Sequence, residues 1–222
     1  MYKTRLFKLL LSLPVFALSG AISIRSGIGV SAWDTFALGI SNSFPIQYGT
    51  VTMITGLVIL LIVLILKQPV GLGTILDTLV IGKLVDFFLW LDFIPTFDFL
   101  PAQICMLLVS LFICSIGCCL YTSAGLSVGP RDTMMIAISQ KVKNVPIGFI
   151  KGAIEAIVFV IGVLLGGPIG IGTLISVFGI GFILQFTLNL FKIDMRNVYQ
   201  ENIIETYTNL KNIYLKSKTS SH

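Results

Sequence analysis

The chain has 222 residues, of which 55% are hydrophobic and 11% charged, and its formal net charge is +5. Soluble domains carry about 25% charged residues, so this composition, with a mean hydropathy of +0.97, excludes an ordinary soluble protein and also a disordered chain. Four cysteines and one histidine argue against a disulfide scaffold or a zinc module, which leaves a polytopic helical membrane protein.

Six apolar segments approach the length of about 20 residues that a helix needs to cross a bilayer. In chain order they are Phe7–Arg25, Gly49–Leu66, Thr74–Leu91, Gln103–Tyr121, Ile147–Leu165 and Thr173–Phe191. Two further apolar segments, Asp34–Ser43 and Asp132–Gln140, are about half as long at a rise of about 1.5 Å per residue. We therefore expect each to enter the membrane as a re-entrant helix and to return to the same side.

Lysine and arginine mark one set of loops, which the positive-inside rule assigns to the cytoplasm. They stand before the first span, after the second, before the fifth and after the sixth: Lys3, Arg5, Lys8, Lys67, Lys141, Lys143, Lys192 and Arg196. The loops on the other side contain Asp92 and Asp98 but no lysine or arginine. This distribution predicts six spans with both termini in the cytoplasm.

Two short motifs occur twice in the same order. The Gly-rich segment at Gly27 returns 98 residues later at Gly125, in each case shortly before an Asp-Thr pair. The Pro-x-Gly-x-Gly-Thr sequence containing Gly73 returns 99 residues later around Gly172. Such spacing indicates an internal repeat, so we expect one transmembrane domain over residues 1–192, with repeats of about 6–92 and 103–191.

Three crossings per repeat is an odd number, so the second repeat must be inverted relative to the first. Inverted repeats with interrupted helices are typical of transporters. A duplication that is retained only for stability, as in a membrane scaffold, is the alternative.

The repeated motifs predict the starts of the half-helices. Asp34 and Asp132 are expected N-caps, because their carboxylates can accept the free N–H groups of a first turn. Gly27, Gly125 and Gly129 allow the chain to turn tightly before those caps. In the second motif, Gly73 and Gly172 predict tight connections between helices and close backbone approach.

Arg131 precedes the second aspartate, and Trp33 is its counterpart in the first repeat. Two half-helix N-termini that meet near the bilayer midplane favour an anion or a polar solute. Arg131 and Trp33 then suit a substrate with one charged and one apolar end. An Arg131–Asp34 lock across the pseudo-twofold axis is the equal alternative.

Several charged residues fall within the spans, where each costs at least about 2.5 kcal/mol on insertion scales. Lys83 and Asp86, three residues apart, and Lys151 and Glu155, four apart, can form local ion pairs. Asp77 is expected near the cytoplasmic headgroups. The functional alternative is a polar track, with Glu155 as a proton carrier, formed by Asp34, Lys83, Asp86, Arg131, Asp132 and Glu155.

The tail, residues 193–222, contains an amphipathic segment over Ile193–Lys216. It predicts a cytoplasmic helix on anionic lipid, with a partner-binding helix as the alternative. The four cysteines of the fourth span are expected to pack against other helices. No pattern for a catalytic triad, metal, cofactor or nucleic acid is found, so an enzyme is not expected.

A Gly-x-x-x-x-x-Trp-Asp-Thr segment at Gly27–Thr35, the run Gly129-Pro130-Arg131-Asp132, a glutamate in the next span and two Pro-x-Gly-x-Gly-Thr turns stand together in this chain. Their combination resembles the YczE/YyaS/YitT family of bacterial membrane proteins, most of all its YczE branch. The resemblance covers roughly residues 5–192 and implies a bacterial inner-membrane location.

These features predict a small secondary transporter or channel for a small polar or anionic solute. A non-transporting scaffold or accessory factor that recruits a protein is the alternative, and an enzyme acting on lipid is a weaker one. The expected partners are the lipid bilayer and the solute, with a homodimer as a further open alternative.

Overall fold

The computed structural model describes residues 2–44, 46 and 48–219, and all regular structure in this part of the chain is helical. The helices are α1 (Tyr2–Arg25), α2 (Ala32–Ser43), α3 (Tyr48–Ile65), α4 (Leu72–Trp90), α5 (Leu100–Ala124), α6 (Pro130–Lys141), α7 (Ile147–Leu164), α8 (Ile171–Phe191) and α9 (Ile203–Thr219). The expected all-helical class is therefore confirmed.

Four of the described helices, α1, α5, α7 and α8, are long and apolar enough to cross a membrane. The other two expected spans fall on α3 and α4. Within α3 the described apolar stretch is Ile54–Ile65, and α4 contains the charged residues Asp77, Lys83 and Asp86. Crossing by α3 and α4 thus stays a prediction.

Sequence signals for helix ends agree with the observed boundaries. Gly125, with φ of +67°, ends α5 in the left-handed conformation that glycine adopts without strain. Pro130 begins α6, where its missing N–H would have no helical partner. The α5–α6 connection is short as a result, and it folds α6 back toward the bundle.

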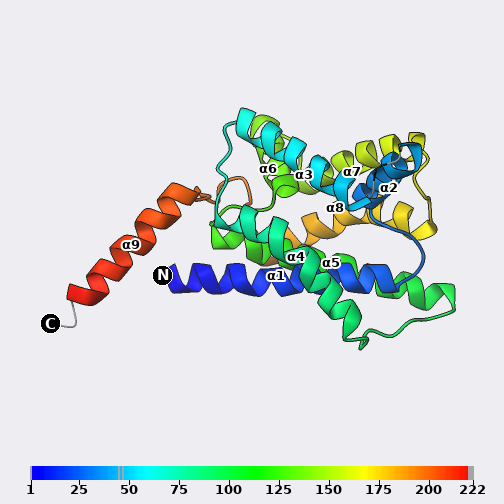
Figure 1. The fold of residues 1–222 in the computed structure, drawn as a ribbon, viewed down its shortest axis with the longest axis horizontal. Helices are drawn as coiled ribbons and strands as arrows, with labels where there is room; N and C mark the ends of the chain where they lie inside the picture. The colour runs from blue at the N-terminus through cyan, green and yellow to red at the C-terminus, as the bar shows by residue number, and fades with distance from the viewer. Residues whose placement is uncertain (1, 45, 47, 220–222) are drawn as a thin grey trace.

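Helices from the two halves of the chain interleave (Figure 1). The two long helices α1 and α5 run side by side, with α4 against α1 and α8 against α5. The short helix α2 packs on α7, and the short helix α6 packs on α3. Each half-length helix thus lies against a long helix of the other half.

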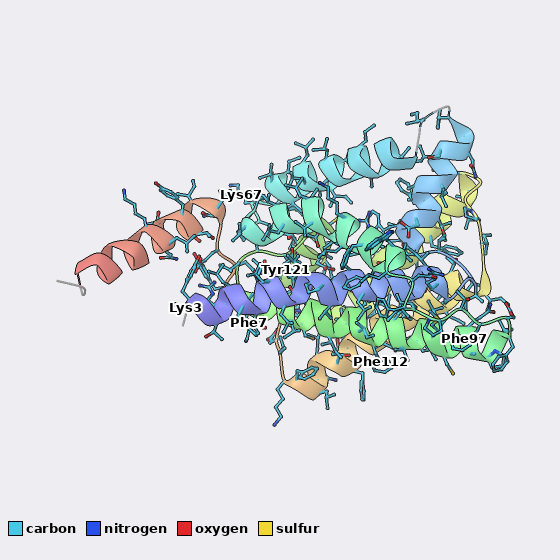
Figure 2. All side chains as sticks on the ribbon, turned by 60° about the horizontal axis from the view of Figure 1, so that its bottom comes forward. Lys3, Phe7, Lys67, Phe97, Phe112 and Tyr121 are labelled. Atoms are coloured by element: carbon cyan, nitrogen blue, oxygen red, sulfur yellow. The ribbon has the colours of Figure 1, made fainter. Side chains whose placement is uncertain are left out.

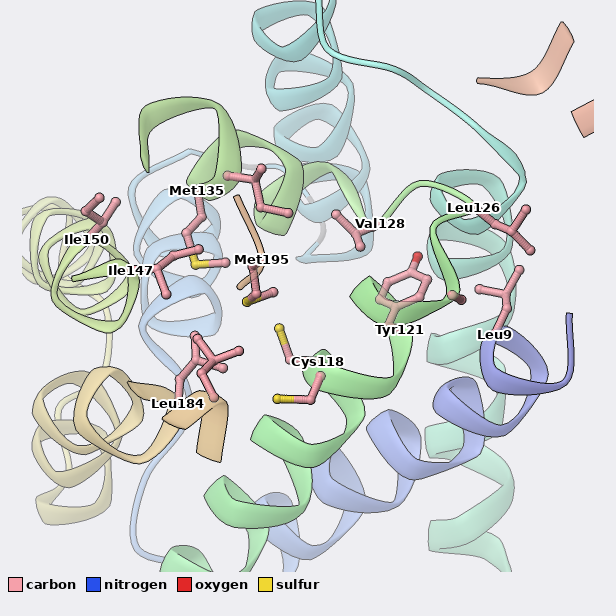
Figure 3. Close-up of a cluster of buried hydrophobic side chains, with 14 residues drawn as sticks. Leu9, Cys118, Tyr121, Leu126, Val128, Met135, Ile147, Ile150, Leu184 and Met195 are labelled. Carbon is pink, nitrogen blue, oxygen red and sulfur yellow. The ribbon is translucent and has the colours of Figure 1, made fainter. Parts of the chain in front are cut away.

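A single cluster of buried side chains joins α1, α5, α6, α7 and α8 (Figure 3). Tyr121 of α5 is fully buried and donates its hydroxyl proton to the carbonyl oxygen of Gly73 at 2.7 Å. Met195, which follows α8, is 1% exposed and lies in this cluster with Met135 and Leu184. Residues after the last long helix therefore contribute to the core.

The C-terminal helix is shorter than predicted. The amphipathic pattern predicts a helix from Ile193, but α9 begins at Ile203. Residues 193–202 instead form turns and irregular chain that pack on the bundle, because Met195 and Glu201 are buried there. The helix α9 itself extends away from the other helices (Figure 1).

The two ends of the bundle differ in composition. Lys3 and Lys67 lie at the end from which α9 extends, whereas Phe97, in the loop between α4 and α5, lies at the opposite end (Figure 2). At that opposite end, Arg25 pairs with Asp92. The ends of α1, α3 and α4 therefore follow the alternating order that the loops predicted.

Candidate functional site

Ser31, not Asp34, caps α2. The backbone N–H of Asp34 donates to the Ser31 hydroxyl oxygen at 3.2 Å, and that hydroxyl donates to the Asp34 carboxylate at 2.9 Å. Asp34 therefore lies in the first helical turn, where its negative charge interacts favourably with the positive end of the helix dipole. The N-cap prediction for Asp34 is wrong by three residues, because the preceding serine reaches the same N–H groups from a better position.

The start of α6 shows the same shift. Gly129 is the N-cap residue of α6, Pro130 is its first helical residue, and Asp132 lies in the first turn. The carboxylate of Asp132 accepts from the ammonium group of Lys151 on α7 at 2.9 Å, and both side chains are mostly buried. Lys151 therefore makes its ion pair across helices, and not with Glu155 as the four-residue spacing predicted.

Arg131 lies over the indole ring of Trp33. Its guanidinium carbon is 4.6 Å from the centre of the ring, which is cation–π geometry. This contact joins the first turn of α6 to the first turn of α2, so residues of the two repeated motifs meet. Among the described residues, no hydrogen bond or ion pair engages the guanidinium of Arg131.

Glu155 of α7 completes this side of the site. Its carboxylate lies within hydrogen-bonding range of the Trp33 side chain, and Lys151, Arg131 and Asp132 are its charged neighbours. Lys151 is one turn earlier on the same helix. The predicted site residues Trp33, Arg131, Asp132 and Glu155 are thus brought together by three helices.

Asp77 of α4 also belongs to the site. Its carboxylate lies against the backbone of Gly129, so close that a Cβ atom at Gly129 would be 2.4 Å from one of its oxygens. Its charged neighbours are Asp132, Arg131 and Lys151. The headgroup position expected for Asp77 stays a prediction, but its contact with the start of α6 was not predicted. The available signal was its place one turn after the repeated Gly73-Thr74 turn, which packs on the start of α6.

The described site contains three interacting carboxylates, on Asp77, Asp132 and Glu155, and two cations, on Arg131 and Lys151. They come from α4, α6 and α7, and only Asp132 and Lys151 form a direct pair. Because charges interact strongly where water is scarce, adding or removing one charge changes the energy of the whole group.

Two crossed hydrogen bonds hold the repeated turns together. The N–H of Gly172 donates to the carbonyl of Ile28, and the N–H of Gly73 donates to that of Leu126, each at 2.9 Å. Ile28 and Leu126 are counterparts 98 residues apart, and the two glycines are counterparts 99 apart. The Pro-x-Gly-x-Gly-Thr turn of each half therefore packs on the Gly-rich turn of the other half.

Gly27 and Gly125 both have positive φ, at +70° and +67°. Gly125 directly follows α5, Gly27 is the second residue after α1, and each lets the chain reverse toward a half-length helix. Their predicted role as turn residues is confirmed.

The predicted charge pair in α4 is not brought into this site. Lys83 is exposed, and its expected partner Asp86 has a side chain outside the described part of the structure. Lys83 therefore faces away from the buried helices. Among the described charged side chains of α4, Asp77 and not Lys83 belongs to the polar cluster.

A cavity of about 370 Å³ opens near the C-terminal part of α6. Its walls are the α3–α4 turn, the Gly-rich turn before α6 and the segment after α8; the residues are Gln68, Pro69, Ser127, Val128, Thr133, Ile136, Gln140, Arg196, Asn197, Val198, Tyr199 and Gln200. Most of these side chains are polar. The cavity lies beside the turn that positions Arg131 and Asp132.

Residues 3–189 match the model of a family of unknown function, DUF6198, and the chain belongs to that family. An uncharacterized protein of Haemophilus influenzae is 30% identical over 189 residues, which are 85% of each chain. The uncharacterized membrane protein YczE of Bacillus subtilis is 28% identical over 79% of this chain and 81% of its own. YyaS of the same bacterium is 27% identical over 73% and 82%.

The YczE/YyaS-like family that the motifs indicated is therefore confirmed. The chain is a membrane protein, since a relative is named as one and four described helices have the required length and hydropathy. No solved structure matches the chain.

Proposed function

We propose that this protein is a small secondary transporter or channel of the bacterial inner membrane that moves a small polar or anionic solute. The observation that carries the proposal is Arg131, whose guanidinium stacks on Trp33 and has no hydrogen-bond acceptor among the described residues. A guanidinium presents five N–H donors in a planar fork that suits a carboxylate or phosphate. An anionic group can bind the edge of this guanidinium while an apolar part of the same solute contacts the indole.

The crossed hydrogen bonds at Gly73 and Gly172 support an arrangement as two inverted three-span repeats. In this arrangement α3 and α4 also cross the bilayer, and α2 and α6 are re-entrant helices that enter from opposite faces. Their N-termini, with Trp33 and Arg131, meet inside the protein. Broken helices that meet in this way form the solute sites of many secondary transporters.

An asymmetry between the halves supports alternating access. Gly148 and Gly181 bring α7 and α8 so close that a Cβ atom on either glycine would lie within 2.5 Å of the other's carbonyl oxygen. Gly82, the counterpart of Gly181, has no such neighbour within 4 Å, and α3 packs on α2 and α6 instead of α4 among the described residues. Two repeats in different arrangements are what a rocking transporter requires, because exchanging them opens the other side.

The charge distribution supports cytoplasmic termini. Lys3 and Lys67 lie at the end of the bundle from which α9 extends (Figure 2), and positive charge favours the cytoplasmic side. Under this orientation the 370 Å³ cavity faces the cytoplasm. The proposed activity requires no resident metal or cofactor and no enzymatic step.

Cysteine-accessibility mapping tests the proposal. Single cysteines are placed across residues 27–43 and 125–140 in a chain that lacks the four native cysteines, and each is labelled from either side of the membrane. We expect the first segment to react from the periplasmic side and the second from the cytoplasmic side. Protection of both segments throughout, or labelling of both from one side, would contradict a solute pathway through the protein.

A non-transporting accessory factor is the second candidate, favoured by α9. This helix extends from the bundle with Ile204 and Tyr207 both more than 60% exposed. If recruitment is the function, deletion of α9 abolishes it while Arg131→Gln has no effect. Transport predicts the reverse order of effects.

A further inference from the structure

The segment between α8 and α9 lies across one end of the bundle. We call residues 198–203 the strap. Just before it, Met195 is buried in the core, and the guanidinium of Arg196 donates to the carbonyl oxygens of Lys143, at 2.8 Å, and Val145. The strap therefore starts from a firmly held point. It also lies beyond residue 189, where the family match ends.

The strap binds the Gly-rich turn that precedes α6. The side-chain oxygen of Gln200 accepts from the Ser127 N–H at 3.0 Å, and its amide nitrogen donates to the Thr122 carbonyl at 3.1 Å. The backbone N–H of Glu201 donates to the Gly125 carbonyl at 2.9 Å. The strap therefore hydrogen-bonds to backbone groups of this turn and of the last residues of α5.

The strap also contacts the turn between α3 and α4, which belongs to the first half of the chain. Ile203 donates its N–H to the Val70 carbonyl at 3.1 Å. Gly71 lies so close that a Cβ atom on it would be 2.4 Å from the Glu201 carbonyl oxygen. One short segment therefore connects turns from both halves of the chain.

A largely buried ion pair fastens the strap to α1. The Glu201 side chain is 5% exposed and accepts from the guanidinium of Arg5 and, at 3.4 Å, from the hydroxyl of Tyr2. Arg5 also donates to the carbonyls of Ala124, at 2.8 Å, and Gly125. A single guanidinium thus holds the strap, the end of α5 and the start of the chain together.

The strap forms one wall of the 370 Å³ cavity. Val198, Tyr199 and Gln200 line it together with Ser127 and Thr133. At the counterpart turn, the Gly172 N–H donates to the Ile28 carbonyl and the Thr173 hydroxyl accepts from the Val30 N–H. Among the described residues, no segment equivalent to the strap adds hydrogen bonds there. The two mouths that the inverted repeats would create are therefore closed by different means.

We propose that the strap is a releasable, autoinhibitory closure of the cytoplasmic mouth, and that the Arg5–Glu201 pair is its latch. This inference rests on the proposed function, since it assigns regulation to the same pathway. While the latch is closed, the strap adds its bonds to the direct contacts between the α3–α4 turn and the α5–α6 turn and covers the cavity beside them. Release of Glu201 removes the strap from both turns and opens the cavity.

The test measures the reaction of a cysteine under the strap with N-ethylmaleimide. The full chain without its native cysteines carries Ser127→Cys and is placed in lipid nanodiscs, where both faces are accessible. It is compared with the same chain bearing Glu201→Gln, and with a chain that ends after Asn197 and so keeps Met195 and Arg196. We expect at least tenfold faster labelling in both release variants.

Two controls separate release of the strap from unfolding. Ser43→Cys, on the exposed end of α2, is expected to react at one rate in all backgrounds. Glu205→Gln removes a carboxylate that accepts from the Asn202 N–H at the start of α9, and it is expected to leave Ser127→Cys protected. Gel filtration confirms that each variant is a single species.

Fast labelling with the strap intact, or protection that persists in both release variants, would overturn the closure. This result is independent of the accessibility mapping across residues 27–43 and 125–140, which decides whether a pathway exists. The strap can therefore fail while the transporter proposal holds, and the reverse is also possible.

Discussion

The crossed turns make a sharp prediction at Gly73. A Cβ atom there would lie 1.9 Å from the Ser127 carbonyl oxygen and 3.0 Å from that of Leu126. Both atoms belong to a backbone that is bonded to the strap and to Gly73 itself, so neither can move without breaking other contacts. Gly73→Ala must therefore push the two turns apart.

The expected cost is worked from two contributions. Overpacking of a close contact costs about 1–3 kcal/mol, and loss of the Gly73–Leu126 hydrogen bond costs about 1 kcal/mol more. Gly82 lies on the same helix and has no neighbour within 4 Å of an added Cβ atom, so Gly82→Ala should gain up to about 1 kcal/mol from helix propensity. The two substitutions should therefore differ by about 3 kcal/mol in unfolding free energy.

Thermal unfolding in detergent, followed by fluorescence-detected gel filtration, measures the difference. At about 2–4 °C per kcal/mol for a chain of this size, the Tm of Gly73→Ala should lie about 6–12 °C below that of Gly82→Ala. Gly172→Ala should fall between them, because its nearest neighbour is the Cγ1 atom of the Ile28 side chain at 2.7 Å. Equal Tm values for the Gly73 and Gly82 variants would refute the close approach of the turns.

Three further predictions address the site and the core. Lys151→Met should destabilise the protein by about 3–5 kcal/mol, because it leaves Asp132 buried without its partner. In a double-mutant cycle, adding Asp132→Asn to Lys151→Met should recover most of that loss. Fully additive effects of the two substitutions would contradict the ion pair. A small anionic solute that binds at Arg131 should stabilise the wild type by about 2.7 kcal/mol at a hundredfold excess over its Kd, measured as a rise in Tm across a panel of carboxylates and phosphates; a solute that stabilises Arg131→Gln equally would place the site elsewhere. Met195→Ala should cost about 2–5 kcal/mol as a core truncation, and a loss below about 0.5 kcal/mol, the range of surface substitutions, would show that residues after α8 lie outside the core.

Local signals identified most of the helices. Hydropathy over about 20 residues finds long apolar segments, and glycine and proline mark their ends, so the helices α1 to α8 fall on the expected segments. The repeated motifs pointed to Trp33, Arg131 and Asp132, and the charge within a predicted span pointed to Glu155; the structure brings these four residues together. The duplication was informative because Trp33 and Arg131, which are equivalent positions of the two copies, are in contact in the structure.

Other features were inaccessible to sequence reasoning because they depend on neighbours far along the chain. The four-residue spacing of Lys151 and Glu155 predicted a local pair, but Asp132 on another helix binds Lys151. The contact of Asp77 with Gly129 at the start of α6 could not be predicted from its place in α4. Ser31 is the N-cap residue because its side chain accepts from the backbone N–H three residues later. Which residue does so depends on the backbone conformation at the start of the helix.

The amino-acid sequence alone determines that this is a helical membrane protein with a duplicated pattern, since apolar length, loop charge and motif spacing are properties of the chain itself. The tertiary structure decides which charges pair, which turns cross and how the segment after α8 is used. Glu201 illustrates the difference: in the sequence it is one acidic residue in a polar tail, and only folding brings Arg5, 196 residues earlier, to its carboxylate. Burial of that pair is a property of the packed bundle, and no local pattern records it.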